Sequence, residues 1–138
     1  MTERRKAREA ALQGLYQMDL SGAGPGEAAL TVLRRFSRGS AAHEYCRLLL
    51  EGVTEHMGEI DGVIEESSEH WTVERMAVVD RNILRMAVFE LLYRRETPYR
   101  VVIDEAVELA KSFGADESAA FINGILDRAA QTLGLKEQ

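Results

Sequence analysis

The chain has 138 residues, a formal net charge of −6 and 46% hydrophobic residues, a composition typical of one ordinary globular domain. No run of about 18 apolar residues occurs, which excludes a membrane-spanning helix, and no apolar segment follows the basic N-terminus, which argues against a secretory signal. We therefore expect a cytoplasmic protein with a single domain over residues 1–138.

The positive charge is concentrated at the N-terminus, in residues 1–8. This arm holds Arg4, Arg5, Lys6 and Arg8 against Glu3, a net charge of +3, which leaves −9 for the rest of the chain. A short basic arm on an acidic body suits a phosphate backbone, because each phosphate that it neutralises releases condensed counterions. The alternative is a solvated, frayed terminus, since basic runs also mark simple interaction tails.

The first predicted element is an amphipathic helix over about residues 3–20, ended by Ser21-Gly22. One of its faces is a stripe of mostly small residues, which lets another helix approach closely. Such packing would offset the roughly 1 kcal/mol that Gly14 costs inside a helix. The members of the stripe are Ala7, Ala10, Ala11, Gly14, Leu15 and Met18.

A second face of this helix combines basic and larger side chains. At 100° per residue, Arg5, Arg8, Leu12 and Tyr16 fall on one side, and Arg5 and Tyr16 project in nearly the same direction. The face is therefore basic with an aromatic ring beneath the charge, an arrangement that suits a nucleic acid. In the alternative reading, Leu12 and Tyr16 simply pack on a second helix.

The later elements are predicted from the spacing of apolar residues and from the polar residues between them. A glycine-rich loop occupies residues 21–26, and Thr72 is placed to cap a short helical turn. Asp80 is placed to cap a strongly apolar central helix, and Gly114 to end the helix that follows it. Two glycines leave the length of the third helix open. The predicted helices cover residues 27–38, from Ala41 to about Ile64, 81–95, 101–113 and a last segment after Asp116.

These elements predict an all-α bundle of six or seven helices with short connections. The single cysteine, Cys46, excludes a disulfide within the chain, and its helical spacing with Tyr45 and Leu49 favours a core position. His43 precedes it by three residues, but no second ligand pair follows, so we predict no metal site and no cofactor.

Phe121 lies at the border of the apolar stripe of the last predicted helix. Asn123 and Gly124 occupy the polar side next to it, and Lys111 and Arg128 add positive charge nearby in the sequence. An aromatic ring in such surroundings can stack on an unpaired base, and such stacking contributes about 1–3 kcal/mol per base to binding. Taken alone, the same pattern also fits a phenylalanine at the edge of the core.

Three blocks of sequence, in order along nearly the whole chain, resemble the NusB family of bacterial antitermination factors. They are RRKARE with ALQGLY (residues 4–9 and 11–16), DRNILRMA leading to Glu90-Leu91 (80–91), and Pro98 to Ala130, which contains IDEA, LAKSFG and FINGILD. The resemblance implies an all-helical fold of two small helical subdomains packed together.

It also implies a function: binding of the single-stranded boxA element of ribosomal RNA and phage leader transcripts. The family does so as a heterodimer with NusE, a ribosomal protein, and joins RNA polymerase with NusA and NusG to suppress premature termination. Carried over by position, the RNA contacts are Arg4, Arg5, Lys6, Arg8, Tyr16, Lys111, Phe121, Asn123, Gly124 and Arg128. The residues implied to face NusE are Glu74, Asp80, Arg81, Leu84 and Glu117, with Asp116 a second candidate for the role of Glu117.

Two other functions are compatible with parts of this sequence. A similar helical domain begins some RNA cytosine methyltransferases, but this chain ends at Gln138 without a cofactor-binding unit, a catalytic cysteine motif or a nucleophile–base pair. We therefore predict that it is not an enzyme. The second alternative is an interaction protein, such as a homodimer that uses the same helical face for itself.

Overall fold

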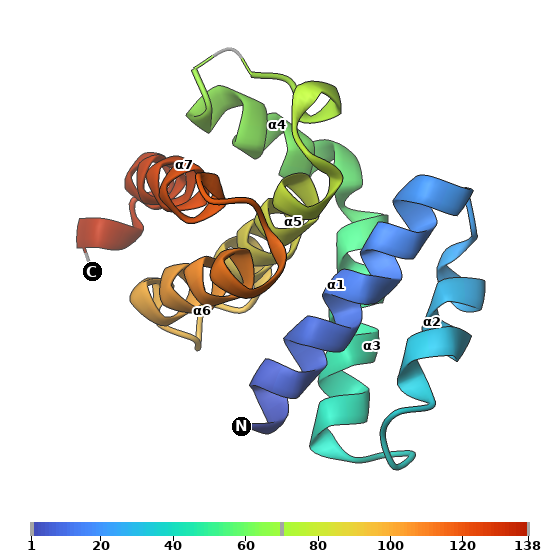
Figure 1. Ribbon diagram of the computed structural model, residues 1–138. Coiled ribbons are helices and arrows are strands. Elements are labelled where there is room, and N and C mark those ends of the chain that lie inside the picture. The colour runs from blue at the N-terminus through green and yellow to red at the C-terminus, as the bar shows by residue number, and fades with distance from the viewer. Residues whose placement is uncertain (1, 70, 138) are drawn as a thin grey trace. The chain divides into compact units, whose positions relative to one another are not determined.

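Helices account for the regular secondary structure of the described residues, 2–69 and 71–137, in this computed structural model (Figure 1). These ranges contain seven α-helices, two 3₁₀ turns and no strand, which confirms the prediction of an all-α protein. None of the described helices is long and apolar enough to cross a membrane. The helices are α1 (Glu3–Ser21), α2 (Pro25–Leu33), α3 (Ala41–Glu55), α4 (Met57–Ser67), α5 (Val78–Tyr93), α6 (Tyr99–Phe113) and α7 (Ser118–Thr132), with 3₁₀ turns η1 (Val73–Arg75) and η2 (Leu135–Glu137).

The chain divides into two compact units, Met1–Glu55 and His56–Gln138. The first contains α1, α2 and α3, and the second contains α4 to α7 with both 3₁₀ turns.

The first unit is built on the small residues of α1, which α2 and α3 flank (Figure 1). A Cβ placed on Gly14 would lie 2.9 Å from Leu50 Cδ2 and 3.5 Å from Val32 Cγ2, so both neighbours approach the backbone of α1 closely. The close approach predicted for this stripe is confirmed. At the two ends, the Thr2 side chain accepts a hydrogen bond from the Arg5 N–H, and Gly22 adopts φ 71°, a conformation that favours glycine.

Two predicted helix boundaries were wrong or left open. The second helix ends at Leu33, not near residue 38, because the N–H groups of Arg35 and Phe36 turn back to the carbonyls of Val32 and Leu33. The predicted third helix is two helices, α3 and α4, separated at His56, whose φ of −113° and ψ of 21° are not helical. The His56 ring stacks on Tyr93, with 4.2 Å between the ring centroids.

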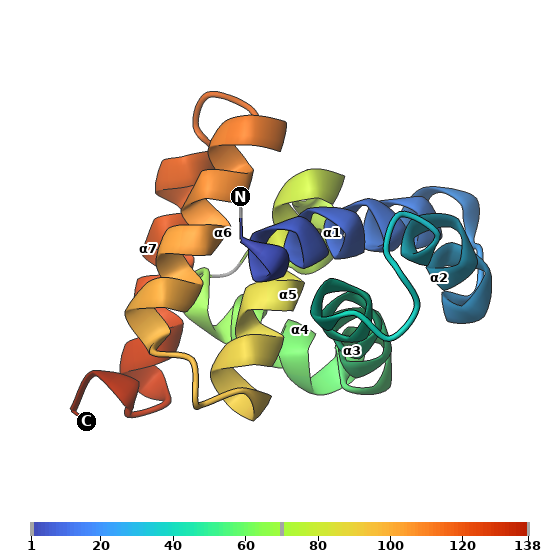
Figure 2. The ribbon, with the colours of Figure 1, turned by 90° about the horizontal axis from the view of Figure 1, so that it is seen from below.

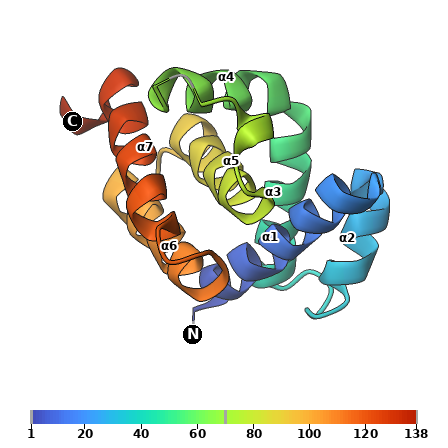
Figure 3. The same ribbon diagram turned by 45° about the horizontal axis from the view of Figure 1, so that its top comes forward.

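In the second unit, α4, α6 and α7 surround α5, as Figure 3 shows. Figure 2 shows α6 and α7 side by side. Ten of the sixteen residues of α5 are buried, which confirms the prediction of a central apolar helix. The cap predicted at Asp80 was wrong, because α5 begins at Val78 and Asp80 lies inside its first turn. Thr72 occupies the N-cap position of the short turn η1, as predicted, but its side chain makes no capping hydrogen bond. A carboxylate in a first turn still interacts favourably with the helix dipole.

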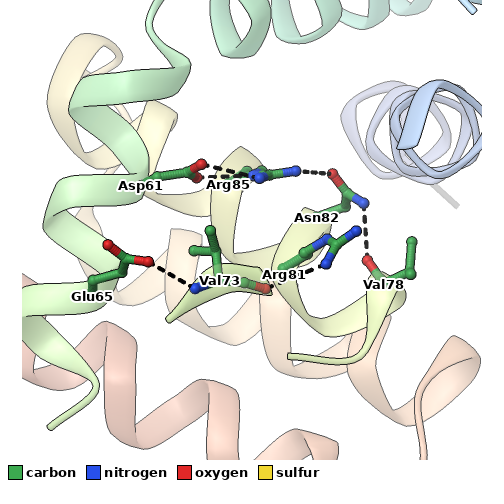
Figure 4. A network of polar contacts seen from close by, with 7 residues as sticks. All are labelled: Asp61, Glu65, Val73, Val78, Arg81, Asn82 and Arg85. Carbon is green, nitrogen blue, oxygen red and sulfur yellow. Dashed lines mark hydrogen bonds and ion pairs between the residues drawn. The ribbon is translucent and has the colours of Figure 1, made fainter. Parts of the chain in front are cut away.

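An ion pair holds α4 against α5 (Figure 4). Arg85 donates from Nε to Asp61 Oδ1 at 2.9 Å and from Nη2 to Asp61 Oδ2 at 3.0 Å, a bidentate arrangement. Arg85 Nη1 also reaches Asn82 Oδ1 at 3.3 Å, and the Asn82 amide donates to the Val78 carbonyl at 2.9 Å. This network ties the start of α5 to the middle of α4.

Cys46 lies in the core of the first unit, as its spacing predicted, with no exposed surface. Burial raises the pKa of its thiol to about 11, and the positive charge of Arg35 opposes this only in part. The thiol therefore stays protonated near neutral pH, and a protonated thiol is a poor nucleophile.

Gly114 ends α6 as predicted, although its backbone is extended and not left-handed. A Cβ at this position would lie 2.6 Å from Ser118 Oγ and 2.8 Å from the Ala110 carbonyl. Ser118 is buried, and its hydroxyl accepts the Ala115 N–H at 2.9 Å. An added methyl group therefore has no room without breaking the connection between α6 and α7.

We expect Gly114→Ala to lower the free energy of unfolding by about 1–3 kcal/mol, the usual cost of overpacking. The matched control is Gly58→Ala in α4, where an added Cβ meets nothing within 4 Å and should raise stability by up to about 1 kcal/mol. Urea denaturation followed by circular dichroism measures both. Equal effects in the same direction would contradict the steric argument.

Candidate nucleic-acid interface

The basic arm is the first part of α1, because this helix begins at Glu3. Arg4, Arg5 and Lys6 are exposed there. The N-terminal end of a helix is the positive end of its dipole, so the positive charges of these side chains are unfavourable there. Glu3 is the one residue of the first turn whose negative charge interacts favourably with the dipole. A bound anion would relieve this repulsion, so the arm is helical, positively charged and suited to phosphate. The frayed terminus of the alternative reading does not match a helix that starts at residue 3.

The aromatic ring of Tyr45 in α3 organises two of the arginines. The guanidinium of Arg4 lies 4.4 Å from the centre of this ring, and that of Arg8 lies 5.7 Å from it, both within cation–π range. Arg8 is only 4% exposed, so it offers almost no surface to a ligand, in contrast to the RNA contact implied by the resemblance. Its position instead supports Tyr45, and thereby Arg4.

On the face of α1 that combines basic and larger side chains, one of the two larger side chains is buried and the other is partly exposed. Leu12 is buried, as the packing alternative predicted, whereas Tyr16 keeps 39% of its surface exposed. Lys6 lies 3.9 Å from the carboxylate of Glu3, and both side chains are about half exposed, so this ion pair is weak and readily exchanged for a phosphate. Arg4, Arg5, Lys6 and Tyr16 form what we call the N-terminal patch.

In the second unit, Phe121, Gly124 and Arg128 lie on one side of α7, at helical spacing i, i+3 and i+7. The Phe121 and Trp71 rings are in T-shaped contact, with 6.2 Å between centroids and 77° between planes. Gly124 leaves space beside Arg128, since a Cβ there would lie 3.9 Å from its guanidinium nitrogens. Trp71, Phe121, Gly124 and Arg128 form what we call the α7 patch.

Arg128 has a structural role within the α7 patch. Its Nε donates to the Ser67 carbonyl at the end of α4 at 2.6 Å, and its Nη1 lies 4.0 Å from the exposed Glu69 carboxylate. The hydrogen bond fixes one side of the guanidinium, while the residue as a whole remains exposed. Arg128 can therefore present a fixed positive charge at the rim of the patch.

Asn123 and Lys111 are the remaining predicted RNA contacts in the second unit. Asn123 is exposed and lines an open hollow of about 470 Å³ on the side of α7 that faces α6, with Tyr99, Arg100, Ile103, Asp104, Asp127 and Lys136. Lys111 is exposed on α6, with its Nζ 3.6 Å from the Glu108 carboxylate. Both side chains are thus exposed, while Phe121, Gly124 and Arg128 share one side of α7.

The sequence model of the NusB family matches residues 5–131 of this chain. The chain belongs to the NusB family. It is 47% identical to the transcription antitermination protein NusB of Geobacter sp. (strain M21), over 99% of this chain and 100% of that protein. Family membership confirms the resemblance seen in the sequence.

Solved NusB structures also match this fold. NusB from T. maritima is 36% identical, covers 94% of this chain and 92% of its own, and has a TM-score of 0.84. A chain from a crystal structure of the antitermination factors NusB and NusE in complex with dsRNA is 31% identical, covers 96% of this chain and 98% of its own, and has a TM-score of 0.86.

The residues that the NusB resemblance assigns to NusE differ in exposure. Glu74 and Glu117 are exposed, and Asp80 and Arg81 are half-buried, with Arg81 Nη1 3.4 Å from the Val73 carbonyl. Leu84 has no exposed surface, so it does not fit a contact with a partner. It is one of the ten buried residues of α5.

Proposed function

We propose that this protein is a transcription antitermination factor that acts by binding and not by catalysis. Together with NusE it binds single-stranded boxA RNA of ribosomal RNA leader transcripts, and it joins the elongating RNA polymerase complex with NusA and NusG in the cytoplasm. Membership of the NusB family supports this proposal, as does the likeness to a chain solved in a complex of NusB, NusE and dsRNA.

The observation that carries the proposal is the N-terminal patch. Exposed cations stand at the positive end of the α1 dipole, and a half-exposed tyrosine lies on the same helix. Recognition of single-stranded RNA commonly combines these two elements, with cations on the backbone and aromatic rings against splayed bases. The α7 patch supplies the same pair of elements, Phe121 and Arg128, in the second unit.

The acidic remainder of the chain supports selectivity. Residues 9–138 carry −9, which repels RNA wherever specific contacts are absent. The exposed Glu74 and Glu117 suit a basic ribosomal partner, because complementary charge speeds association and disfavours wrong partners. We propose that residues 1–138 act as one RNA-binding domain to which both units contribute contacts.

The test is fluorescence anisotropy of a labelled boxA RNA, a shuffled RNA of equal length and a boxA duplex, with and without NusE, over a salt titration. We expect the single-stranded boxA to bind most tightly, with a further gain on addition of NusE and a linear loss of log affinity with log salt. Weak and equal binding of all RNAs would overturn the proposal. Sedimentation of the free protein in the same buffers tests the alternative of a homodimer.

A further inference from the structure

Trp71, the only tryptophan of the chain, has half of its side chain in solvent. Its exposed fraction is 51%, although tryptophan is the largest apolar side chain, and its ring packs by an edge against Phe121. Neither its spacing nor a motif in the sequence singled out this residue. A single exposed apolar side chain is ordinary, but two aromatic rings in contact at the surface form the kind of contiguous apolar area that marks binding sites.

The backbone at Trp71 and Val73 is fixed by one side chain of α4, Glu65, and by Ser68, the residue that follows this helix. Ser68 Oγ donates to the Trp71 carbonyl at 2.7 Å, and a carboxylate oxygen of Glu65 accepts the Val73 N–H at 2.9 Å. Figure 4 shows the Glu65–Val73 hydrogen bond. The backbone that follows the indole is therefore held by two hydrogen bonds, which lowers the entropy that a ligand must remove on binding.

The surroundings of Trp71 favour a nucleic-acid base over an apolar peptide. Arg128 holds a guanidinium at the rim of the same patch through its hydrogen bond to Ser67, where it can meet a phosphate. Every base has a π-face, so aromatic stacking accepts any sequence, and a nearby cation adds backbone affinity. The Trp71 and Phe121 planes differ by 77°, so one flat base cannot stack on both rings.

We propose that Trp71 is a second base-stacking residue, on which one unpaired RNA base stacks next to a different base held by Phe121. This inference rests on the proposed function and adds to it a residue outside the set carried over from the family. It also assigns two nucleotides, not one, to the α7 patch. The edge contact between the two rings sets the angle between the two bases.

The single tryptophan makes a direct experiment possible. Unlabelled boxA RNA is titrated into the wild-type protein with selective excitation of the indole, and we expect saturable quenching of the indole emission. In anisotropy titrations, Trp71→Ala should weaken boxA binding about 5- to 100-fold, whereas Trp71→Phe should retain most of the affinity. The control is Leu30→Ala, which removes a 64% exposed apolar side chain from α2 and should leave affinity unchanged.

The outcomes separate this inference from the proposed function. Retained boxA preference with no quenching, and with Trp71→Ala binding as wild type, would overturn the inference and leave the function intact. A defect of Trp71→Ala that appears only in the presence of NusE would place the ring against the protein partner and likewise overturn it. Loss of boxA preference in the wild type would overturn both. Thermal melts by circular dichroism verify that each variant is folded.

Discussion

Asp61→Ala is expected to lower the free energy of unfolding by about 3 kcal/mol, the lower end of the range for breaking a buried ion pair. The Asp61 and Arg85 side chains are only 20% and 11% exposed, so the substitution leaves the guanidinium without its carboxylate where water reaches it poorly. Both Asp61 oxygens are used, at 2.9 and 3.0 Å. The measurement is urea denaturation followed by circular dichroism.

A double-mutant cycle isolates the pair from the loss of side-chain packing. Arg85→Ala should also destabilise the protein, and the double variant should lose clearly less than the two single losses combined. Glu44→Ala is the matched control, because Glu44 pairs with Arg47 at 2.6 Å on an exposed surface of α3, where an ion pair contributes little. Equal losses for Asp61→Ala and Glu44→Ala would contradict the role given to burial.

Phe121→Ala is expected to weaken boxA binding by about 1–3 kcal/mol without changing its salt dependence, because it removes a stacking surface and no charge. Arg5→Ala, in contrast, should lower affinity for all RNAs and reduce the salt slope by about 0.7, the value for one phosphate contact on a single strand. Anisotropy titrations at several salt concentrations between about 50 and 200 mM measure both the affinity and the salt slope.

The control for the charge is Arg95→Ala, which removes an exposed arginine after the end of α5, outside both patches. It should change the salt slope less than Arg5→Ala does. Equal slope losses for Phe121→Ala and Arg5→Ala would show that the two residues do not divide the work as proposed. A boxA-to-shuffled affinity ratio that is unchanged in Phe121→Ala would assign base selection to other residues.

The parts of the fold that follow from apolar spacing could be predicted from the sequence. The small stripe of α1, the burial of α5 and the core position of Cys46 all follow from the spacing of apolar residues within one helix. This spacing can be read directly from the sequence. The break at His56 could not be predicted, since it coincides with the stacking of His56 on Tyr93, a contact between residues far apart in the sequence. The early end of α2 and the start of α5 before Asp80 show that helix ends are set by context.

The prediction of the site residues was limited because the sequence does not show which side chains are exposed. Resemblance carries residues over one position at a time and cannot tell whether a side chain reaches solvent. The resemblance implies ligand contacts for Arg8 and Leu84, whereas Arg8 is 4% exposed and Leu84 has no exposed surface. Trp71 was missed for the opposite reason, because a lone aromatic between polar residues has no periodicity, and only its contact with Phe121 reveals its neighbourhood.

The burial and protonation of Cys46 make site-directed spin labelling of this protein straightforward. Because the native thiol is buried and protonated, a cysteine introduced at an exposed position would be the only one to react quickly with maleimide or a methanethiosulfonate. Two such positions, Leu30 in the first unit and Arg95 in the second, would carry a pair of spin labels without removal of the native residue. Their distance distribution with and without RNA would then report how ligand binding changes the conformational ensemble.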